Sequence, residues 1–496
     1  MILPMWRRVT SGPAVAVFMA LCGLGLTACA GAPLQQDGAE RCRMLIDRVD
    51  RRLDDKGVRD AETARIEGFP YLRVNRFLSS FRTDFGQERK AGGAFDDWLR
   101  RLRALDREAR QVELQNLGAA NIAASVEACA ETLLADERDR PGFKAALIRA
   151  ARVPSSYDDA VRAAGLYPVT QIGVALGFER WKDENLGTFA EAPDTWAANE
   201  TVYGLLPDDP PGADAAAALI DLASNNALSI PDLSGTVLSE LASAYAPVIA
   251  VEEASGADRI GRPYWPSAES AAPTTDPADP VIYIRLAHTR FGDEILPQLV
   301  YTVWFPARPK TGPLDILGGA LDGFVWRVTV SHEGRPLVYD TFHACGCYHL
   351  FFPVPPVVRT AVPEDDDLRE EPLVPRAAPV LEPGERLVLH IASGSHYLRN
   401  LSVAGKVDPD RRLRLVDEAA APEYGLRSLE QADGTRRSLY GPDGIVPGTA
   451  RAERFLLWPM GIASPGAMRQ WGTHATAFVG TRHADDSFLM DEAFAR

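Results

Sequence analysis

Apolar residues recur at helical spacing through the first half of the chain. Three stretches place apolar side chains on one helical face: Cys42, Leu45, Ile46, Val49 and Leu53; Phe95, Trp98, Leu99, Leu102 and Leu105; and Ile122, Val126, Cys129 and Leu133. Shorter helical patterns follow at 143–152, 157–164, 213–224 and 234–245, and proline or glycine separates them. We therefore expect a helical domain over residues 40–253.

The spacing changes to a period of two after residue 280. β-branched and aromatic residues dominate several segments for which the pattern predicts strands: 281–291, 299–305, 324–330, 336–343, 385–392, 412–416 and 454–460. The run SHEGR at 331–335 predicts a hairpin turn. The sequence therefore predicts an α+β protein in which a mainly antiparallel, β-rich domain covers residues 281–496.

Two segments show neither the helical nor the alternating spacing of apolar residues. Residues 254–280 are rich in Pro, Ser and Ala, which is typical of a linker. Residues 353–384 hold eight prolines and the acidic run EDDDLREE, and we expect a long surface loop there. The chain is longer than a usual single domain, which agrees with one domain on each side of the linker.

The N-terminus has the pattern of an export signal. Residues 1–12 contain Arg7 and Arg8 but no acid, and an apolar run follows over 13–28. An uncleaved anchor is the alternative, but the run is shorter than the ~20 residues of a spanning helix. The run ends in Leu26-Thr27-Ala28-Cys29, which resembles the lipobox of bacterial lipoprotein precursors.

This resemblance covers the first 29 residues only and indicates no family for the rest of the chain. It implies that residues 1–28 are removed, that Cys29 is lipidated and that residues 29–39 form a tether. Ala30 in place of an aspartate implies sorting to the outer membrane, with the protein facing the periplasm. Several acyl chains on one residue would hold the protein stably to a membrane.

The charge of the chain excludes one class of partner. Loss of residues 1–28 removes two positive charges and no negative one, which changes the formal net charge from −15 to −17. Nucleic acids are bound by clustered Lys and Arg, so we exclude a nucleic-acid-binding function. The sequence does not define which protein or other envelope component the chain binds.

Export also changes how the cysteines are interpreted. Cys42 and Cys129 both lie on apolar helical faces, and in an oxidising compartment two such cysteines are expected to form a disulfide. Two reduced, packed thiols are the alternative.

The run FHACGCYH at 342–349 is the main candidate for chemistry. In an extended strand, His343, Cys345, Cys347 and His349 would share one face with ~6.7 Å between neighbours, so that one ion could not contact all four. A turn at Gly346 could instead gather them. Imidazole and thiolate are ligands of zinc and copper, and we predict a site for one of these metals.

All eight histidines lie in the predicted β-rich domain, and His390 and His396 in the run HIASGSH are added to the predicted metal ligands. Two other interpretations of the motif stay open. Cys345 and Cys347 could form a disulfide or redox pair, or the segment could be only a structural strand end. The haem-binding pattern Cys-x-x-Cys-His does not fit, because one residue rather than two separates the cysteines.

Established catalytic motifs give no further direction, since the chain has no G-x-S-x-G, H-E-x-x-H or P-loop pattern. Polar residues at 468–486, among them Arg469 and Arg482, could line a pocket for an anionic or sugar-like ligand or only form a polar strand and loop. Whether the protein is an enzyme is left undecided. The two hypotheses are a metal-dependent enzyme acting on an envelope substrate and a non-catalytic envelope lipoprotein with a binding or structural role.

Overall fold

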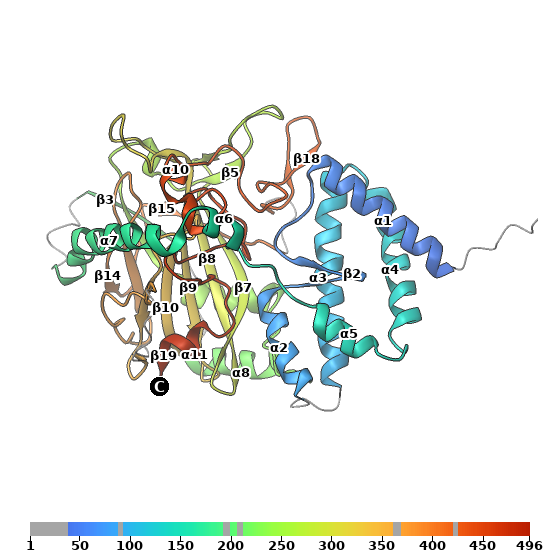
Figure 1. Ribbon diagram of the computed structural model, residues 1–496. Coiled ribbons are helices and arrows are strands. Elements are labelled where there is room, and N and C mark those ends of the chain that lie inside the picture. Colours follow the sequence, from blue (N-terminus) through green and yellow to red (C-terminus); the bar gives the residue numbers. More distant parts are fainter. Residues whose placement is uncertain (1–37, 88–92, 192–198, 206–211, 361–368, 420–424) are drawn as a thin grey trace, which may run out of the picture.

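The computed structural model describes residues 38–87, 93–191, 199–205, 212–360, 369–419 and 425–496. The predicted signal, the lipobox and Cys29 lie outside these residues. Helices dominate the N-terminal part and two sheets dominate the C-terminal part, so the predicted α+β class is confirmed (Figure 1). Within the described residues, no helix has both the length and the apolar character needed to cross a membrane.

The N-terminal unit packs helices around a small hairpin. Its helices are α1 (Gly38–Lys56), α2 (Arg76–Gly86), α3 (Ala94–Asn116), α4 (Ala123–Glu137) and α5 (Phe143–Ala150), and the hairpin is formed by β1 (Ala64–Ile66) and β2 (Phe69–Val74). Asn75 begins α2, because its side-chain oxygen accepts a hydrogen bond from the Leu78 amide at 2.8 Å. Trp98 of α3 is fully buried in the core that the helices share with β2.

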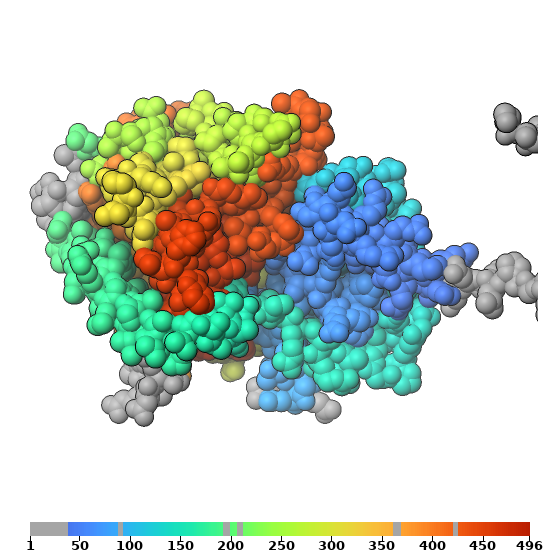
Figure 2. Space-filling view, turned by 45° about the horizontal axis from the view of Figure 1, so that its top comes forward, coloured from blue at the N-terminus to red at the C-terminus, as the bar shows by residue number. Residues whose placement is uncertain are grey.

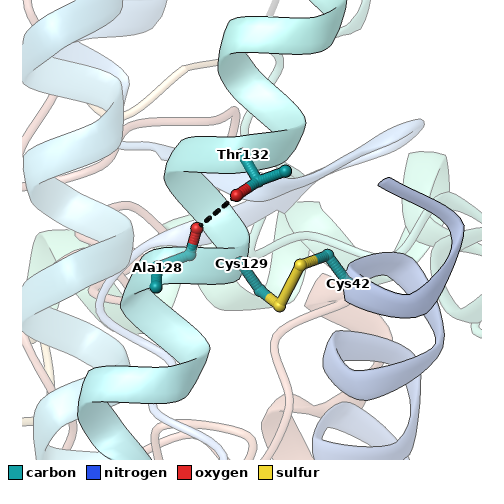
Figure 3. Close-up of a disulfide and its surroundings, with 4 residues drawn as sticks. All are labelled: Cys42, Ala128, Cys129 and Thr132. Atoms are coloured by element: carbon teal, nitrogen blue, oxygen red, sulfur yellow. Dashed lines mark hydrogen bonds between the residues drawn. A yellow bond between two sulfur atoms is a disulfide. The ribbon is translucent and has the colours of Figure 1, made fainter. Parts of the chain in front are cut away.

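A disulfide joins the first helix of this unit to the fourth. The sulfur atoms of Cys42 in α1 and Cys129 in α4 are bonded, and the two Cα atoms lie 4.8 Å apart (Figure 3). The predicted pairing is therefore confirmed. The bond closes a loop with a sequence separation of 87 residues, which includes α2 and α3.

The C-terminal unit is built on two sheets with a common core. One sheet has the order β11-β10-β9-β8-β7-β16 and the other the order β14-β13-β4-β3-β15. Apolar side chains of both sheets meet in one cluster, among them Trp326 of the first and Leu389 of the second. The strands of the two sheets are β3 (Glu200–Gly204), β4 (Val248–Glu252), β7 (Val281–Phe291), β8 (Glu294–Arg308), β9 (Gly319–Val330), β10 (Pro336–His343), β11 (Leu350–Pro353), β13 (Arg386–Ile391), β14 (Leu398–Ala404), β15 (Arg411–Arg412) and β16 (Arg414–Asp417).

Strand pairing crosses the domain boundary expected at residue 253. β3 and β4 precede that residue, yet β4 pairs in parallel with β13. Two helices from the same region, α8 (Ala213–Ala223) and α9 (Gly235–Tyr245), contribute buried residues to the core between the sheets. The segment expected to be a linker, 254–280, forms β5 (Arg262–Tyr264) and β6 (Thr274–Asp276), and its Ile260 and Trp265 are buried.

One predicted strand is wrong. Residues 454–460 form the short helix α10 (Arg454–Leu457) and a 3₁₀ turn, Trp458–Met460. Phe455 and Leu456 are exposed, so no sheet partner stabilises an extended conformation there. The described residues of the expected loop 353–384 contain the two-residue strand β12 (Val358–Arg359), which pairs with β19 (Phe494–Ala495).

Two further helices cover the sheets. α6 (Asp159–Ala164) and α7 (Tyr167–Asn185) follow the N-terminal unit along the chain and lie over the C-terminal unit (Figure 1). Figure 2 shows this green segment against the orange and red C-terminal residues. None of the 19 residues of α7 is buried, although several are large and apolar.

Ion pairs join the N-terminal unit to the C-terminal unit. Most of them place an arginine of the second unit against a carboxylate of the first. They include Arg285–Glu62, Arg290–Asp84, Arg427–Asp60 and, with the charges reversed, Arg76–Asp485.

We expect replacement of both Cys42 and Cys129 by Ala to lower the free energy of unfolding by ~2–4 kcal/mol, because the open chain regains loop entropy when it unfolds. Denaturant unfolding followed by circular dichroism would measure the loss. A double variant as stable as the unreduced parent protein would contradict this role of the bond. The parent protein under reducing conditions serves as the control, since it should match the variant.

Candidate functional site

The candidate site lies at the turn that follows β10. The strand ends at His343, whose amide donates a hydrogen bond to the carbonyl of Cys347 at 3.0 Å, while the Gly346 amide donates to the His343 carbonyl at 2.7 Å. Gly346 has a φ of 94°, and a Cβ atom at this position would lie 2.2 Å from the carbonyl oxygen of Ala475. Only glycine fits such a position without a shift of the backbone.

This turn changes the geometry expected from the sequence. Residues 343, 345, 347 and 349 were expected to share one face of an extended strand, and that expectation is wrong because the chain reverses at Gly346. The turn that was weighed as the alternative is present, but it does not gather the four side chains. His343 and His349 have different hydrogen-bond partners, and the two cysteines lie in a third environment.

His343 lies beside a buried cluster that contains His396 and two aspartates. Nδ1 of His396 donates to Asp322 at 2.7 Å, and its Nε2 lies 3.5 Å from a carboxylate oxygen of Asp258. Nε2 of His343 donates to the carbonyl of His396 at 3.1 Å. The ring of Phe305 stacks on His396 with a centroid distance of 3.9 Å, which holds the imidazole in the plane between its two carboxylates.

The cluster shifts the pKa of each of these groups. Burial disfavours the charged form of His396, but the hydrogen bond to Asp322 and the nearby carboxylate of Asp258 outweigh burial, so the pKa of His396 lies above its ordinary value. Burial would raise the pKa of Asp322, but the hydrogen bond from His396 and the nearby imidazole of His343 hold it well below the usual range. Burial lowers the pKa of His343, although the nearby carboxylate of Asp322 opposes that fall. The cluster therefore favours the imidazolium form of His396 between two carboxylates and the neutral form of His343 next to it.

His349 belongs to a second buried group on the other side of the turn. Its Nε2 donates to Asp340 at 3.0 Å, and Arg327 binds the same carboxylate through two nitrogens at 2.8 and 2.9 Å. Burial lowers the pKa of His349 to about 4 although Asp340 acts against that fall. The neutral imidazole keeps Nδ1 as an acceptor, and this atom has no hydrogen-bond partner among the described residues.

His390 is separate from both groups. It lies on β13, where Nδ1 contacts Glu200 at 2.9 Å and Nε2 contacts Ser402 at 2.8 Å. Among the residues that the structure describes, no group of three or more His, Cys, Asp and Glu side chains is placed to hold a metal ion. The predicted set of His343, Cys345, Cys347, His349, His390 and His396 is thus divided between several places, and the zinc or copper site stays a prediction.

Two pockets lie on either side of Tyr348 and Trp181, whose rings are 5.0 Å apart. The smaller one has a volume of about 210 Å³ and is lined by His343, Tyr397 and Leu398, among others. The larger one, here called the α7 pocket, has a volume of about 580 Å³. Tyr348 itself has a φ of 61°, a strained conformation for a tyrosine, and such strain is concentrated at functional sites.

The α7 pocket lies between one face of α7 and the C-terminal segments. The helix contributes residues at positions 170, 173, 174, 177, 178 and 181, which is the spacing of one helical face. The opposite wall is formed by the turn and by loops and includes Cys347, His349, Leu457, Ala475, Phe478 and Arg482. An added Cβ atom at Gly173 or Gly177 would meet no atom within 4 Å, so open space lies next to this face of α7.

Sequence patterns missed several residues of the site. Asp258 lies in the segment expected to be a linker, and Asp322 is a single acid at the edge of a predicted strand; neither carries a local signal. α7 was missed because its apolar residues, such as Val169, Ile172 and Phe178, surround the helix rather than form one stripe. Arg469 and Arg482 were noted as pocket residues, and Arg482 does line the α7 pocket.

The His396 cluster should make stability depend on pH. Folding raises the pKa of His396. This residue therefore contributes its full stabilisation of the folded state at pH values below its unfolded pKa of ~6.5, and the stabilisation is lost as the pH rises through the folded pKa. His396→Gln should therefore cost ~3 kcal/mol near pH 6, since it leaves two buried carboxylates unpaired, and less at pH 9. Urea unfolding across this range measures the difference, with the hairpin-turn variant His332→Gln as control. A difference that stays constant or grows with pH would contradict the charged cluster.

Comparison with known proteins adds no relative to this description. No known protein family, no curated protein and no solved structure matches the chain. The function is therefore inferred from the residues of the site alone.

Proposed function

We propose that the protein is a lipid-anchored binding protein of the bacterial cell envelope that holds an apolar ligand in the α7 pocket. The observation that carries this proposal is the space of about 580 Å³ next to α7, lined mostly by apolar side chains. Pockets of this size, with many apolar and few polar groups, are typical small-molecule sites.

The walls of the pocket favour a long, flexible apolar molecule. Val174, Phe178, Leu457 and Phe478 supply apolar surface, and a few polar groups also line the pocket. Arg482 is one of these, and it donates hydrogen bonds to Thr476 and to the carbonyl of Glu370. A fatty acyl chain fits this combination, because it needs apolar contact along its length and a cation or donor near its head group.

The structure of α7 supports the same proposal. A helix with apolar residues on all sides is expected to be buried, yet no residue of α7 is buried. Its inner face borders open space at Gly173 and Gly177. A bound acyl chain would cover this face and remove apolar surface from water at about 25 cal/mol per Å².

The location in the envelope rests on separate support. The lipobox at Leu26–Cys29 predicts a lipid anchor, and a disulfide such as Cys42–Cys129 is typical of proteins outside the cytosol. The metal-dependent enzyme considered above remains an alternative, but no group of described side chains favours it.

Filling the pocket should abolish binding without loss of stability. In Gly177→Leu the new side chain has free space to occupy, and leucine is also a better helix former than glycine by ~0.8 kcal/mol. Titration with a fluorescent fatty acid, displaced by oleate, should give a dissociation constant at least ~10-fold weaker than that of the parent protein, or ~1.4 kcal/mol.

Gly187→Leu is the matched control for this experiment. An added Cβ at Gly187 also meets no atom within 4 Å, but Gly187 does not line the α7 pocket. The Gly187→Leu variant should bind the probe with the same affinity as the parent protein. A parent protein that binds no probe, or a Gly177→Leu variant that binds equally well, would contradict the proposal.

Anchoring is tested by Cys29→Ser in cells. This change removes the sulfur that the lipobox predicts to be acylated, so the protein should leave the membrane fraction and lose label from a radioactive fatty acid. A neighbouring Ala30→Ser variant should stay with the membrane. A Cys29→Ser protein that still sediments with membranes and carries label would refute the predicted anchor.

A further inference from the structure

The two free cysteines of the described chain lie next to each other, and one of them lines the α7 pocket. Cys345 and Cys347 flank Gly346, and the Cys347 amide donates a hydrogen bond to the sulfur of Cys345 at 3.4 Å. Both side chains are buried within the C-terminal unit, and Cys347 also lines the pocket. A molecule in the pocket can therefore reach one member of the pair.

Arg469 lies beside this pair and has no acidic partner. Its backbone amide donates to the carbonyl of Ala344 at 2.8 Å, which places it next to the turn. One guanidinium nitrogen, Nη2, donates to the carbonyls of Ala463 and Ser464. Nε has no hydrogen-bond partner, and within the described chain no carboxylate lies at ion-pair distance from Arg469.

Several other buried arginines of the protein are ion-paired, whereas Arg451 and Arg482, like Arg469, donate to backbone carbonyls or a hydroxyl. Arg73 contacts Glu113 at 2.7 Å, Arg327 contacts Asp340 at 2.8 Å, and Arg427 contacts Asp60 at 2.8 Å. Arg469 is only 4% exposed, and a buried cation without a counter-ion is costly. The groups around Arg469 that can carry negative charge include the two sulfurs of the turn and, with a smaller effect, the carboxylate of Asp443.

We propose that Cys345 and Cys347 are a reactive thiol pair, which Arg469 supports in its thiolate form and which undergoes exchange with disulfides of the cell envelope. A thiolate is the nucleophile in such exchange, and reactive cysteines lie next to cations and near a surface or cleft. This proposal does not depend on which ligand fills the pocket.

The electrostatics of the pair agree with one shared negative charge. Contact with Cys345 raises the pKa of Cys347 well above its ordinary value, and burial adds to the rise, so the pair loses one proton far more readily than two. Burial lowers the pKa of Arg469, while the charge that both cysteines can carry opposes that fall.

The exchange balances in two steps. When the single negative charge of the pair lies on Cys347 and the proton on Cys345, the Cys347 sulfur attacks one sulfur of a disulfide R–S–S–R′, forms a mixed disulfide with R′ and releases RS⁻, which takes up a proton. Cys345 then loses its proton and attacks the sulfur of Cys347, which releases R′S⁻ as the second thiol. The pair is oxidised to a disulfide, the substrate is reduced to two thiols, and the reverse sequence passes the disulfide to a dithiol.

The experiment uses the full chain, equilibrated with mixtures of reduced and oxidised glutathione and analysed by peptide mass spectrometry. The peptide that contains residues 345 and 347 should convert from two alkylatable thiols to an internal disulfide as the mixture becomes more oxidising. Cys345→Ser should instead accumulate glutathione on Cys347, because the second attack is lost.

The role of Arg469 is measured by the rate of thiol alkylation with a haloacetamide at neutral pH. The native thiols should react faster than the same thiols in urea, and Arg469→Met should slow the reaction about tenfold, the change that accompanies a pKa rise of about one unit. Arg469→Lys keeps the charge and should retain most of the rate. An intact Cys42–Cys129 disulfide and an unchanged melting curve show that each variant is folded.

Three results would overturn the proposal. These are no disulfide between Cys345 and Cys347 at any glutathione ratio, native thiols that react no faster than unfolded ones, and thiols occupied by a stoichiometric metal ion. The second result can be read from the parent protein alone, so it does not depend on whether the Arg469 variants fold.

Discussion

Most buried charged side chains of this protein lie against a group of opposite charge, and this pairing fixes most of the arrangement around the site. Arg73 is held by Glu113 in the N-terminal unit, and Arg427 reaches from the C-terminal unit to Asp60 of the first. Because unpaired buried charge is costly, each such pair fixes the relative position of the elements that carry it. The carboxylates of the helical unit thus orient the sheets against it.

The same constraint explains what surrounds the turn at 343–349. Asp322 and Asp258 hold His396 on one side, and Asp340 holds His349 and Arg327 on the other. Both histidines are therefore occupied by carboxylates. The cysteines remain, and the buried charge next to them is that of Arg469, which explains why the chemistry proposed for this turn belongs to sulfur. The pocket beside Cys347 and the thiol pair would then be two parts of one site.

The sequence predicted more of the architecture than of the site. Amphipathic helices such as 143–152 and 234–245 could be predicted because a helix that buries one face carries apolar residues at a regular spacing. The disulfide was predicted from the same spacing, which places Cys42 and Cys129 on apolar helical faces. Short strands such as β3 and β4 show no such pattern. Their stability comes from pairing within a sheet in which β4 lies next to β13, far along the chain.

Within the site, the local sequence pattern identified the right segment but did not predict its geometry. The run FHACGCYH marked the turn, but its shape depends on contact between Gly346 and Ala475, which lie far apart in sequence. Asp258, Asp322 and Arg469 act on the motif from three other segments, and no spacing rule connects them to it. For the same reason, six expected metal ligands with suitable chemistry did not converge.

The central claim is that α7 covers a space that a ligand fills. Hydrogen–deuterium exchange of the full chain, with and without oleate, tests it most directly, because amide exchange reports the local stability of each helix. The account predicts that oleate slows exchange in α7 and in residues 345–349 and 475–478, while exchange in α3 stays unchanged. Unaltered exchange in α7 at saturating oleate, or an equal slowing throughout the chain, would contradict it.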